Sequence, residues 1–527
     1  MSQMLKSSSA MGAATMLSRV LGLVREIVYA SFMGTGWVAD AFFFAFQVPN
    51  LFRRLLGEGA LTAAFIPIFK EKEKLEGDAA MWRGANAVIS GLVVSSAAVI
   101  VLGVAGISIA LATGWIHDPQ TSLMLELLRV MFPYILLVCL AAIFMGMLNA
   151  RGHFFVPAMG ATMLNLVMIA SVLWLAPHLG STPSEQIVAL AYGVVAAGCA
   201  QAFFQLPLLN REGFRWKWVT PWRDDTVRRV VQQMLPATIG VAAFQINVLV
   251  TASLAFGDKG IVSSFNYAVR LMEFPQGIFG ISLATYLLPA LSGLAAEKKF
   301  PEFRATLGQG LGYLIFLNAL ASVLLCLLAE PMIRLLFERR SFDSASTGDS
   351  AFALQFLAPG LLAFSIVNIL ARAFYALGDT RTPMRISIVC LTLNVLFAWL
   401  LLKPLRQGGL GLANSASAFL NMGLLLYALR RKLGRLELAE LRRTLAPILG
   451  AAFLAGVVAF TAETLWRRNL GYATFALRLG HVFVPMLLAT AVYFGVSVFM
   501  GVGYAKDFFT LLRRKLKPAH TPGENLP

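Results

Sequence analysis

Long apolar runs, separated by short polar segments, follow one another along nearly the whole chain. Most of these runs reach about 20 residues, the length that an α-helix needs to cross the hydrocarbon core of a bilayer. The pattern therefore predicts an all-α, polytopic membrane protein with about 14 transmembrane helices. The predicted spans are residues 9–33, 37–68, 84–112, 122–149, 155–177, 186–209, 229–256, 262–292, 305–329, 350–377, 384–402, 409–429, 444–465 and 479–503.

Composition agrees with this pattern. The 527 residues are 58% hydrophobic and 13% charged, whereas a soluble domain is about half apolar and a quarter charged. This excludes a disordered chain, a collagen-like chain and a disulfide scaffold. The five histidines lack metal-ligand spacing and there is no P-loop lysine motif, so we expect no metal site, no cofactor and no ATP hydrolysis. Four cysteines, each inside an apolar run, are expected to be small buried side chains: Cys139, Cys199, Cys326 and Cys390.

The basic residues are distributed unevenly between the two sides of the predicted spans. With the N-terminus placed in the cytoplasm, 28 of the 44 Lys and Arg fall in cytoplasmic segments and 9 on the other side. The positive-inside rule then predicts a multi-pass membrane protein with an even number of spans and both termini cytoplasmic. The net charge of +17 is interpreted as this topology signal together with attraction to anionic membrane lipids. Nucleic acid is not expected as a partner, because no soluble domain could bind it, and a monomer is expected.

The chain also resembles itself at an offset of 226 residues, and six predicted spans separate the two copies. This predicts a parallel repeat with two six-helix lobes, residues 1–219 and 220–437, around a central cavity. Two extra helices, within residues 438–510, and a basic tail, residues 511–527, follow the repeat. The matched positions are Pro49 with Pro275, Pro133 with Pro359, Pro157 with Pro383, Gly34 with Gly260, and Gly152 with Gly378.

The two extra spans are almost uncharged and contain a stripe of small residues. Their only predicted ionisable groups are Glu463 and His481. Small residues leave room beside a helix for a close partner, so we expect a groove for a lipid tail, with a dimer interface or a packing appendage as alternatives. The stripe is Gly450, Ala451, Ala452, Ala455 and Gly456.

Three spans carry charges where the bilayer makes them costly, by about 2.5–3.5 kcal/mol each on insertion scales. Arginines outnumber carboxylates in this set, which predicts a cationic, water-filled cavity for an anion. Arginine suits a phosphate because its planar fork donates two parallel hydrogen bonds. The alternative is that the charges form internal ion pairs that fix helix packing. The candidates are Ser18, Arg19, Arg25 and Glu26 in the first span, Asp40, Arg53, Arg54 and Glu58 in the second, and Arg270 and Glu273 in the eighth.

Helical spacing suggests partners within this set. Arg19 and Glu26 share one helix face, and so do Ser18 and Arg25. Arg54 and Glu58 are i,i+4 neighbours, and Arg270 and Glu273 are i,i+3 neighbours. Whether Arg53 or Arg54 faces the cavity stays open, since the two point about 100° apart.

These residues form motifs that resemble those of the MurJ (MviN) lipid II flippases, within the multidrug/oligosaccharidyl-lipid/polysaccharide exporter superfamily. The resemblance covers essentially all 14 spans. It rests on Ser18-Arg19-Val20-Leu21-Gly22 with Arg25, Asp40-Ala41-Phe42, Pro49-Asn50-Leu51-Phe52-Arg53-Arg54, Glu58-Gly59-Ala60, Phe132-Pro133-Tyr134 and Arg270-Leu271-Met272-Glu273-Phe274-Pro275.

The resemblance implies a transporter, not an enzyme, that moves lipid II (undecaprenyl-diphosphate-linked disaccharide-pentapeptide) from the cytoplasmic to the periplasmic leaflet by alternating access. It implies essential cavity arginines at Arg19, Arg25, Arg53 and Arg270, with acidic partners at Asp40, Glu58 and Glu273. It also implies that the last two spans hold the polyprenyl tail. Some members bind sodium in the second lobe through Asn and Asp, but the similar positions here are Asn368 and Arg372, and an arginine cannot ligate sodium.

Two other functions fit parts of the sequence. An exporter of another polyprenyl-linked oligosaccharide, or of drugs, would share the superfamily architecture, although a cavity for cationic drugs should be acidic. A membrane glycosyltransferase would need catalytic carboxylates on a sizeable outer loop. The longest predicted outer segment, residues 330–349, is short and offers only Glu338, Asp343 and Asp349 besides Glu330.

Overall fold

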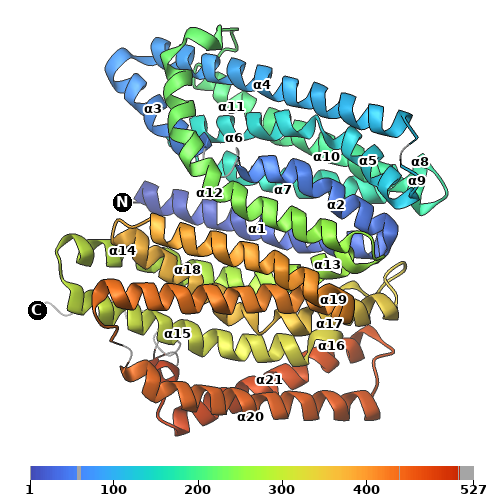
Figure 1. The fold of residues 1–527 in the computed structure, drawn as a ribbon, viewed down its shortest axis with the longest axis vertical. Coiled ribbons are helices and arrows are strands. Elements are labelled where there is room, and N and C mark those ends of the chain that lie inside the picture. The colour runs from blue at the N-terminus through green and yellow to red at the C-terminus, as the bar shows by residue number, and fades with distance from the viewer. Residues whose placement is uncertain (1, 56–60, 115, 438, 508–509, 511–527) are drawn as a thin grey trace, which may run out of the picture. The chain divides into compact units, whose positions relative to one another are not determined.

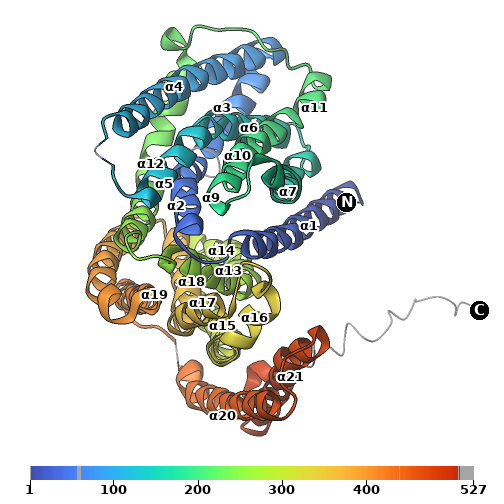
Figure 2. The same ribbon diagram turned by 90° about the vertical axis from the view of Figure 1, so that its right-hand side faces the viewer.

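The computed structural model describes residues 2–55, 61–114, 116–437, 439–507 and 510. Within these ranges the chain forms helices and connecting segments and contains no β-strand, which confirms the all-α prediction. The helices fall into two compact units, which are described separately. In each of them long helices run side by side (Figures 1 and 2).

Unit 1 comprises Met1–Tyr267 and Phe337–Ser346. An aromatic and aliphatic core that includes Phe65, Phe69, Phe144 and Phe214 holds part of it together. Its elements are α1 (Ser2–Met33), α2 (Trp37–Phe52), α3 (Leu61–Glu76), α4 (Asp78–Ala112), α5 (Pro119–Met131), α6 (Tyr134–Ala150), α7 (Phe155–Ala170), η2 (Ser171–Leu175), α8 (Ala176–Leu179), α9 (Pro183–Gln186), α10 (Val188–Phe203), α11 (Leu206–Arg211), η3 (Pro221–Arg223), α12 (Asp225–Ala255) and the first turns of α13 (Ile261–Pro275).

Unit 2 comprises Ala268–Leu336 and Thr347–Pro527. Its core brings Phe303 and Phe316 together with Tyr493, whose hydroxyl donates to the carbonyl of Phe316 at 2.6 Å. Besides the rest of α13, its elements are η4 (Gln276–Ile281), α14 (Ser282–Ala296), α15 (Phe300–Leu327), α16 (Ala329–Phe337), α17 (Ser344–Leu357), α18 (Gly360–Ala376), α19 (Arg381–Leu433), α20 (Ala439–Asn469) and α21 (Phe475–Phe499).

Eight helical segments of the described chain are long and apolar enough to cross a membrane, or up to ten if two bent pairs are counted as single spans. The bent pairs are α5 with α6, at 42°, and α17 with α18, at 47°. The single helix α19 covers two predicted spans, since its backbone breaks at Arg406 (φ 46°, ψ −128°). Length and composition do not identify the predicted spans 9–33, 37–68 and 229–256. The first two carry charges within the span, whereas the third has only Arg229, at its first position. The number 14 stays a prediction.

The predicted repeat has a counterpart in local backbone geometry. Pro133 and Pro359 each stand at the break of a bent helix pair. Gly152 and Gly378 both have positive φ, at 87° and 73°, as do Gly34 and Gly260, at 57° and 83°. Three of the five matched pairs therefore share a helix break or a positive φ, and the two six-helix lobes stay a prediction.

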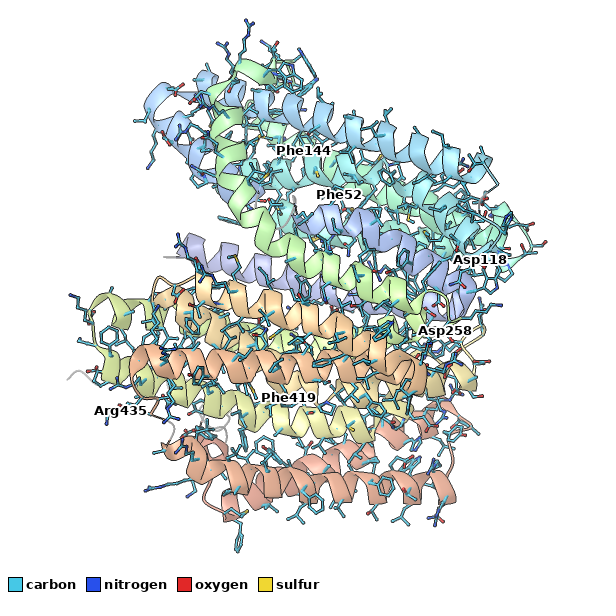
Figure 3. The ribbon with its side chains drawn as sticks, in the orientation of Figure 1. Phe52, Asp118, Phe144, Asp258, Phe419 and Arg435 are labelled. Atoms are coloured by element: carbon cyan, nitrogen blue, oxygen red, sulfur yellow. The ribbon has the colours of Figure 1, made fainter. Side chains whose placement is uncertain are left out.

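The loops of unit 1 lie at the two ends of its helices. At one end the side-chain amide of Gln120 donates to the carbonyl of Phe256 at 2.7 Å, and Figure 3 shows Asp118 and Asp258 there. At the other end Arg151 bonds Glu73 and Glu212, at 2.5 and 3.0 Å. The first set of residues belongs to predicted outer loops and the second to predicted cytoplasmic loops, so the chain alternates between ends as expected.

Candidate functional site

The charged residues of α1 lie in its second half. Arg25 pairs with the neighbouring Glu26 at 2.5 Å, and its guanidinium lies 5.5 Å from the centre of the Tyr29 ring. Glu26 is 4% exposed, whereas Arg19 is exposed. The carboxylate partner of Arg25 is thus adjacent in sequence, and the pairing of Arg19 with Glu26 suggested by their common face is not seen. Ser18 contributes its backbone carbonyl, which accepts from the side-chain amide of Asn165 in α7 at 3.0 Å.

The end of α2 carries the next two arginines. The helix gives way to a π-helical turn at residues 53–55, just after Pro49. Arg53 and Arg54 are half-buried in this turn, and the Arg53 Nε donates to the side-chain oxygen of Asn50 at 2.8 Å. Glu58, expected as an i,i+4 partner of Arg54, lies outside the described residues.

A row of aromatic rings connects Arg25 of α1 with the start of α6. The Tyr29 ring, which lies beside Arg25, packs on Phe42 of α2 with ring centroids 5.8 Å apart. Phe42 stacks on Phe46 at 6.0 Å, and Phe46 lies 6.4 Å from the Tyr134 ring. Tyr134 is fully buried at the start of α6, and its hydroxyl lies 3.4 Å from the amide oxygen of Gln201. The structure therefore connects Arg25 with α2, whose C-terminal end bears Arg53, and with Tyr134 of α6. Tyr134 was absent from the predicted site, although it belongs to a recognised motif.

Asp40 has a different role from the one predicted. It was expected to face an arginine, but its two carboxylate oxygens accept from the backbone N–H groups of Gly260, at 2.5 Å, and Ser263, at 2.7 Å. These donors stand at the start of α13, where a helix leaves N–H groups without partners and favours a negative charge. Asp40, at 0% exposure, is a helix cap, and the prediction that an arginine is its partner is wrong.

Further contacts join the same end of unit 1. The hydroxyl of Tyr267 donates to the carbonyl of Gly34 at 3.4 Å, and the hydroxyl of Thr35 donates to that of Ser346 at 2.7 Å. Gly34 has a φ of 57°, and a Cβ there would overlap the carbonyl of Ser341. The loop between α1 and α2 is therefore tightly packed against the start of α13 and against residues 341–346.

Arg270 and Glu273 form the predicted i,i+3 pair in α13, with 2.9 Å between Arg270 Nη1 and Glu273 Oε2. Their side chains are 33% and 44% exposed. This pair belongs to unit 2, whereas the other predicted site residues belong to unit 1. Also in unit 2, Arg372 donates to the hydroxyl of Thr285 at 2.7 Å. A guanidinium therefore stands at the position where, by the resemblance, some family members have a sodium ligand.

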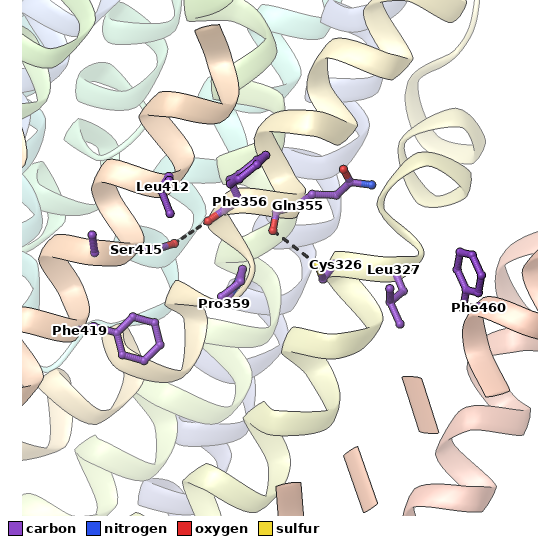
Figure 4. A pocket seen from close by; sticks show the side chains of 10 residues that line it. Cys326, Leu327, Gln355, Phe356, Pro359, Leu412, Ser415, Phe419 and Phe460 are labelled. Atoms are coloured by element: carbon purple, nitrogen blue, oxygen red, sulfur yellow. Dashed lines mark hydrogen bonds between the residues drawn. The ribbon is translucent and has the colours of Figure 1, made fainter. Parts of the chain in front are cut away.

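Unit 2 contains a largely apolar cavity of about 550 Å³, shown in Figure 4. It lies between α15, the α17–α18 break and the second half of α19, with Phe460 of α20 at one side. In its wall the Ser415 hydroxyl donates to the carbonyl of Phe356 at 2.7 Å, and the Cys326 thiol lies 3.6 Å from the carbonyl of Gln355. The lining residues are Cys326, Leu327, Gln355, Phe356, Pro359, Leu412, Ser415, Ala416, Phe419 and Phe460.

The small-residue stripe of α20 does not line this cavity. Ala451 and Ala455 are fully buried in the core of unit 2, and a Cβ on Gly456 would lie 3.0 Å from Val323 of α15. The partner that these small residues admit is therefore another helix. A hollow suited to an acyl chain exists nearby, but α20 contributes to it through Phe460, which the stripe argument did not identify.

The only ionisable groups predicted in the last two spans bind each other. His481 Nε2 lies 3.1 Å from Glu463 Oε1, and both side chains are buried. Tyr472 stacks on the His481 ring with centroids 5.9 Å apart, and the Arg334 guanidinium of α16 lies 4.0 Å from the centre of the Tyr472 ring. This cluster joins α16, α20 and α21 at one end.

Comparisons with known proteins agree on one family. A family model described as "Lipid II flippase MurJ" matches residues 29–480. The chain is 36% identical over 484 residues to a "Probable lipid II flippase MurJ" of Vibrio cholerae, covering 88% of this chain and 89% of that protein. It is 34% identical over 501 residues to a "Lipid II flippase MurJ" of Burkholderia cenocepacia, covering 93% and 96%.

Solved structures show the same fold. One titled "Lipid II flippase MurJ, inward closed conformation" matches with a TM-score of 0.74 at 21% identity, covering 93% of this chain and 99% of that one. An inward-facing multidrug resistance MATE family transporter of the MOP superfamily matches with a TM-score of 0.65 at 14% identity, covering 81% and 98%. At these identities the likeness concerns the fold alone.

Proposed function

The chain belongs to the MurJ family of lipid II flippases, and from this membership we propose that it moves lipid II across the inner membrane with its cavity arginines on the diphosphate. It is a multi-pass membrane transporter. We place both termini in the cytoplasm and the direction of transport from the cytoplasmic to the periplasmic leaflet. The alternation of the loops of unit 1 between two ends supports this orientation, together with the 28 to 9 distribution of basic residues.

The observation that carries the proposal is that the helix of Arg25 contacts α2, whose C-terminal end bears Arg53, through the rings of Tyr29 and Phe42 at 5.8 Å between centroids. The two spans also carry Arg19 and Arg54, so arginines exceed carboxylates by four to three when Glu58 is included. Of these carboxylates, Asp40 neutralises a helix N-terminus instead of an arginine. An excess of positive charge therefore stays in this region of the membrane, where an anion can bind.

A diphosphate suits this arrangement. The charged headgroup of lipid II would lose its hydration in the hydrocarbon core, at a cost that fixed arginine donors offset. We propose that Arg19, Arg25 and Arg53 bind it together with Arg270 of the second copy. The membrane potential, positive outside, favours outward movement of an anion by about 2.3 kcal/mol per charge for each 100 mV.

Alternating access requires contacts that close one end and then break. Asp40 lies in the first copy of the repeat and Ser263 in the second, and they are hydrogen-bonded at the predicted outer end. We propose that this cap closes the outer gate and that its release opens the cavity to the periplasmic leaflet. The lipid tail stays in the bilayer throughout, and the apolar cavity of unit 2 is our candidate for its seat.

The proposal is tested by following lipid II at the outer face of cells that depend on this protein. Replacing Arg25 by Ala should stop its appearance there without removing the protein from the membrane. An exporter of another polyprenyl-linked oligosaccharide is the second candidate, and cells that keep lipid II at the outer face while losing a different lipid-linked glycan would favour it.

A further inference from the structure

The segment between α11 and α12 has an unusual composition. It has no regular structure except the short η3 (Figure 2), and it alternates basic residues with tryptophans: Arg215, Trp216, Lys217, Trp218, then Trp222 and Arg223. We call residues 214–223 the interfacial loop. The tryptophans are 50%, 58% and 75% exposed in chain order, which is costly for so large an apolar surface unless something covers it.

The interfacial loop is fastened along α4 in an extended form. The Asn86 side chain donates to the carbonyl of Arg215 at 2.9 Å and accepts from the N–H of Lys217 at 3.3 Å. One helical turn further, the Ser90 hydroxyl accepts from the N–H of Val219 at 3.3 Å. The four residues from Asn86 to Ser90 rise about 6 Å along the helix, and two extended residues span about 6.6 Å. The loop therefore runs parallel to the α4 axis, in register with it.

This extended form makes the loop amphipathic. Successive side chains of an extended chain point to opposite faces, so Trp216 and Trp218 share one face, and Arg215 and Lys217 share the other. The start of the loop is fixed by Phe214, which is 2% exposed and packs on Trp82 with ring centroids 5.7 Å apart. One face is thus aromatic and the opposite face basic.

The position along α4 sets the depth of the loop in the membrane. Arg83 is the last charged residue of α4, and the helix continues to Ala112 without another. Residues 92–112 alone span about 31 Å, which matches the hydrocarbon thickness of about 30 Å. Pro221 lies beside Gly91, where an added Cβ would be 3.2 Å from it. The loop therefore reaches to the border of the hydrocarbon, where tryptophan is favoured.

Two carboxylates that flank the loop, Glu212 and Asp224, are bound to other partners. Glu212 accepts from Arg151 at 3.0 Å and lies 2.8 Å from His153 Nε2. Asp224 accepts from the backbone of Thr226 at 2.9 Å and so caps α12. A partner for this loop must combine an apolar region, for the tryptophans, with negative charge directly above it.

We propose that the interfacial loop is a membrane anchor that binds anionic phospholipid headgroups, with its tryptophans at the acyl boundary and its basic residues on the phosphates. Each Lys or Arg near an anionic surface strengthens such binding. The loop connects the two copies of the repeat, so the anchor holds the connection at a fixed depth while the copies move. The leaflet follows from the proposed orientation and is the cytoplasmic one.

Lipid binding to the purified, full-length protein in detergent tests this directly. Dioleoyl phosphatidylglycerol and dioleoyl phosphatidylcholine are titrated separately, and bound lipids are counted by native mass spectrometry. The test variant is R215Q/K217Q/R223Q, and the matched control is R430Q/R431Q/R435Q, three exposed arginines in the last turn of α19 and just after it, where no tryptophan lies. We expect the test variant to bind phosphatidylglycerol about tenfold more weakly than the wild type, with the control unchanged.

The depth of the tryptophans is checked in phosphatidylglycerol vesicles. Phospholipids brominated near the headgroup end of the acyl chain should quench the wild type more than the variant W216S/W218S/W222S, which lacks the three anchoring rings. Equal loss of phosphatidylglycerol binding in the test and control variants would overturn the proposal. An unchanged preference of the test variant for phosphatidylglycerol over phosphatidylcholine would overturn it as well, and is the result expected if a soluble protein covers the loop. Neither the count of bound lipids nor the quenching of tryptophan fluorescence depends on lipid II transport.

Discussion

The carboxylate of Asp40 accepts a hydrogen bond from the backbone N–H of Ser263 at 2.7 Å, across 223 residues of sequence. Its second oxygen accepts from Gly260 at 2.5 Å. One side chain from the first copy of the repeat therefore caps a helix that begins the eighth predicted span, in the second copy. Hydrogen bonds to a charged group contribute about 1.5–3 kcal/mol each, so this cap is strong enough to favour one conformation.

Replacing Asp40 by Ala should open the outer end. A cysteine at position 35, in a variant without the native cysteines, is labelled from outside with a membrane-impermeant maleimide. Loss of both hydrogen bonds should raise the labelling rate about tenfold or more. The control is Asp258→Asn, an exposed carboxylate of the same end, which should leave the rate unchanged. Equal rates in Asp40→Ala and the wild type would show that the cap does not close this end.

Replacing Arg19, Arg25 or Arg270 by Ala should abolish complementation of a depleted strain while the protein stays in the membrane. Arg25→Lys should restore function only in part, because an ammonium lacks the planar fork of arginine. Arg129→Ala is the control, since this exposed arginine lies near the outer end of its predicted span. Full complementation by all three alanine variants would contradict the diphosphate site.

Filling the cavity of unit 2 should impair the handling of the lipid tail. Ala416→Trp places a large ring among the lining residues, so transport of the polyprenyl-linked substrate should fall. Binding of a tail-less headgroup analogue, measured by calorimetry, should stay unchanged. Gly450→Trp is the control, because a Cβ there meets no atom within 4 Å. Loss of analogue binding in Ala416→Trp would indicate a folding defect instead.

Breaking the buried pair of Glu463 and His481 should destabilise the last two helices. Glu463→Ala leaves His481 buried at 1% exposure without its acceptor, at a cost of about 1–3 kcal/mol. Thermal unfolding in detergent should show a clearly lower Tm. Thr461→Ala removes an exposed hydroxyl of the same helix and should change the Tm little. A Tm for Glu463→Ala equal to that of the control would show that the pair adds no stability.

The ion pair between Lys432 and Asp379, at 2.6 Å, should add stability that depends on pH. The hydrogen bond from Lys432, followed by that from the Thr382 backbone, lowers the pKa of Asp379 to about 2. Because this folded-state pKa is below the usual value of about 3.9, the stabilisation is complete above pH 4 and is lost as the pH falls toward 2. Asp379→Asn keeps a capping side chain for Thr382 but loses the charge. Its Tm deficit should be constant above pH 5 and shrink below pH 4; a deficit that does not change with pH would exclude this charge effect.

The sequence was informative where a property is local. The offset of 226 residues matched Pro133 with Pro359, and both stand at the bends of two helix pairs. The i,i+3 pair of Arg270 and Glu273 followed from helical spacing alone and is confirmed. These features depend on a few neighbouring residues, so periodicity and backbone chemistry are enough to find them.

Features that depend on distant packing were missed. Nothing in the sequence near Asp40 shows that its carboxylate oxygens accept hydrogen bonds at the start of a helix more than 200 residues away. An arginine partner was therefore the reasonable expectation. Likewise the small residues of α20 signalled a close partner but not which one, and the partner is α15. The chain also reverses direction at Arg406, which has a positive φ. No sequence rule predicts this backbone conformation for an arginine.

The central claim, that this protein brings lipid II to the outer face by means of membrane arginines, is tested most directly by lipid II accessibility. Cells depleted of the native protein are supplied with the wild type or with Arg25→Ala, and the share of lipid II cleaved by an externally added lipid II hydrolase is measured. We predict that depletion removes the cleavable pool, that the wild type restores it, and that Arg25→Ala, present at equal amount in the membrane, does not. A cleavable pool that survives depletion, or that Arg25→Ala restores in full, would contradict the account.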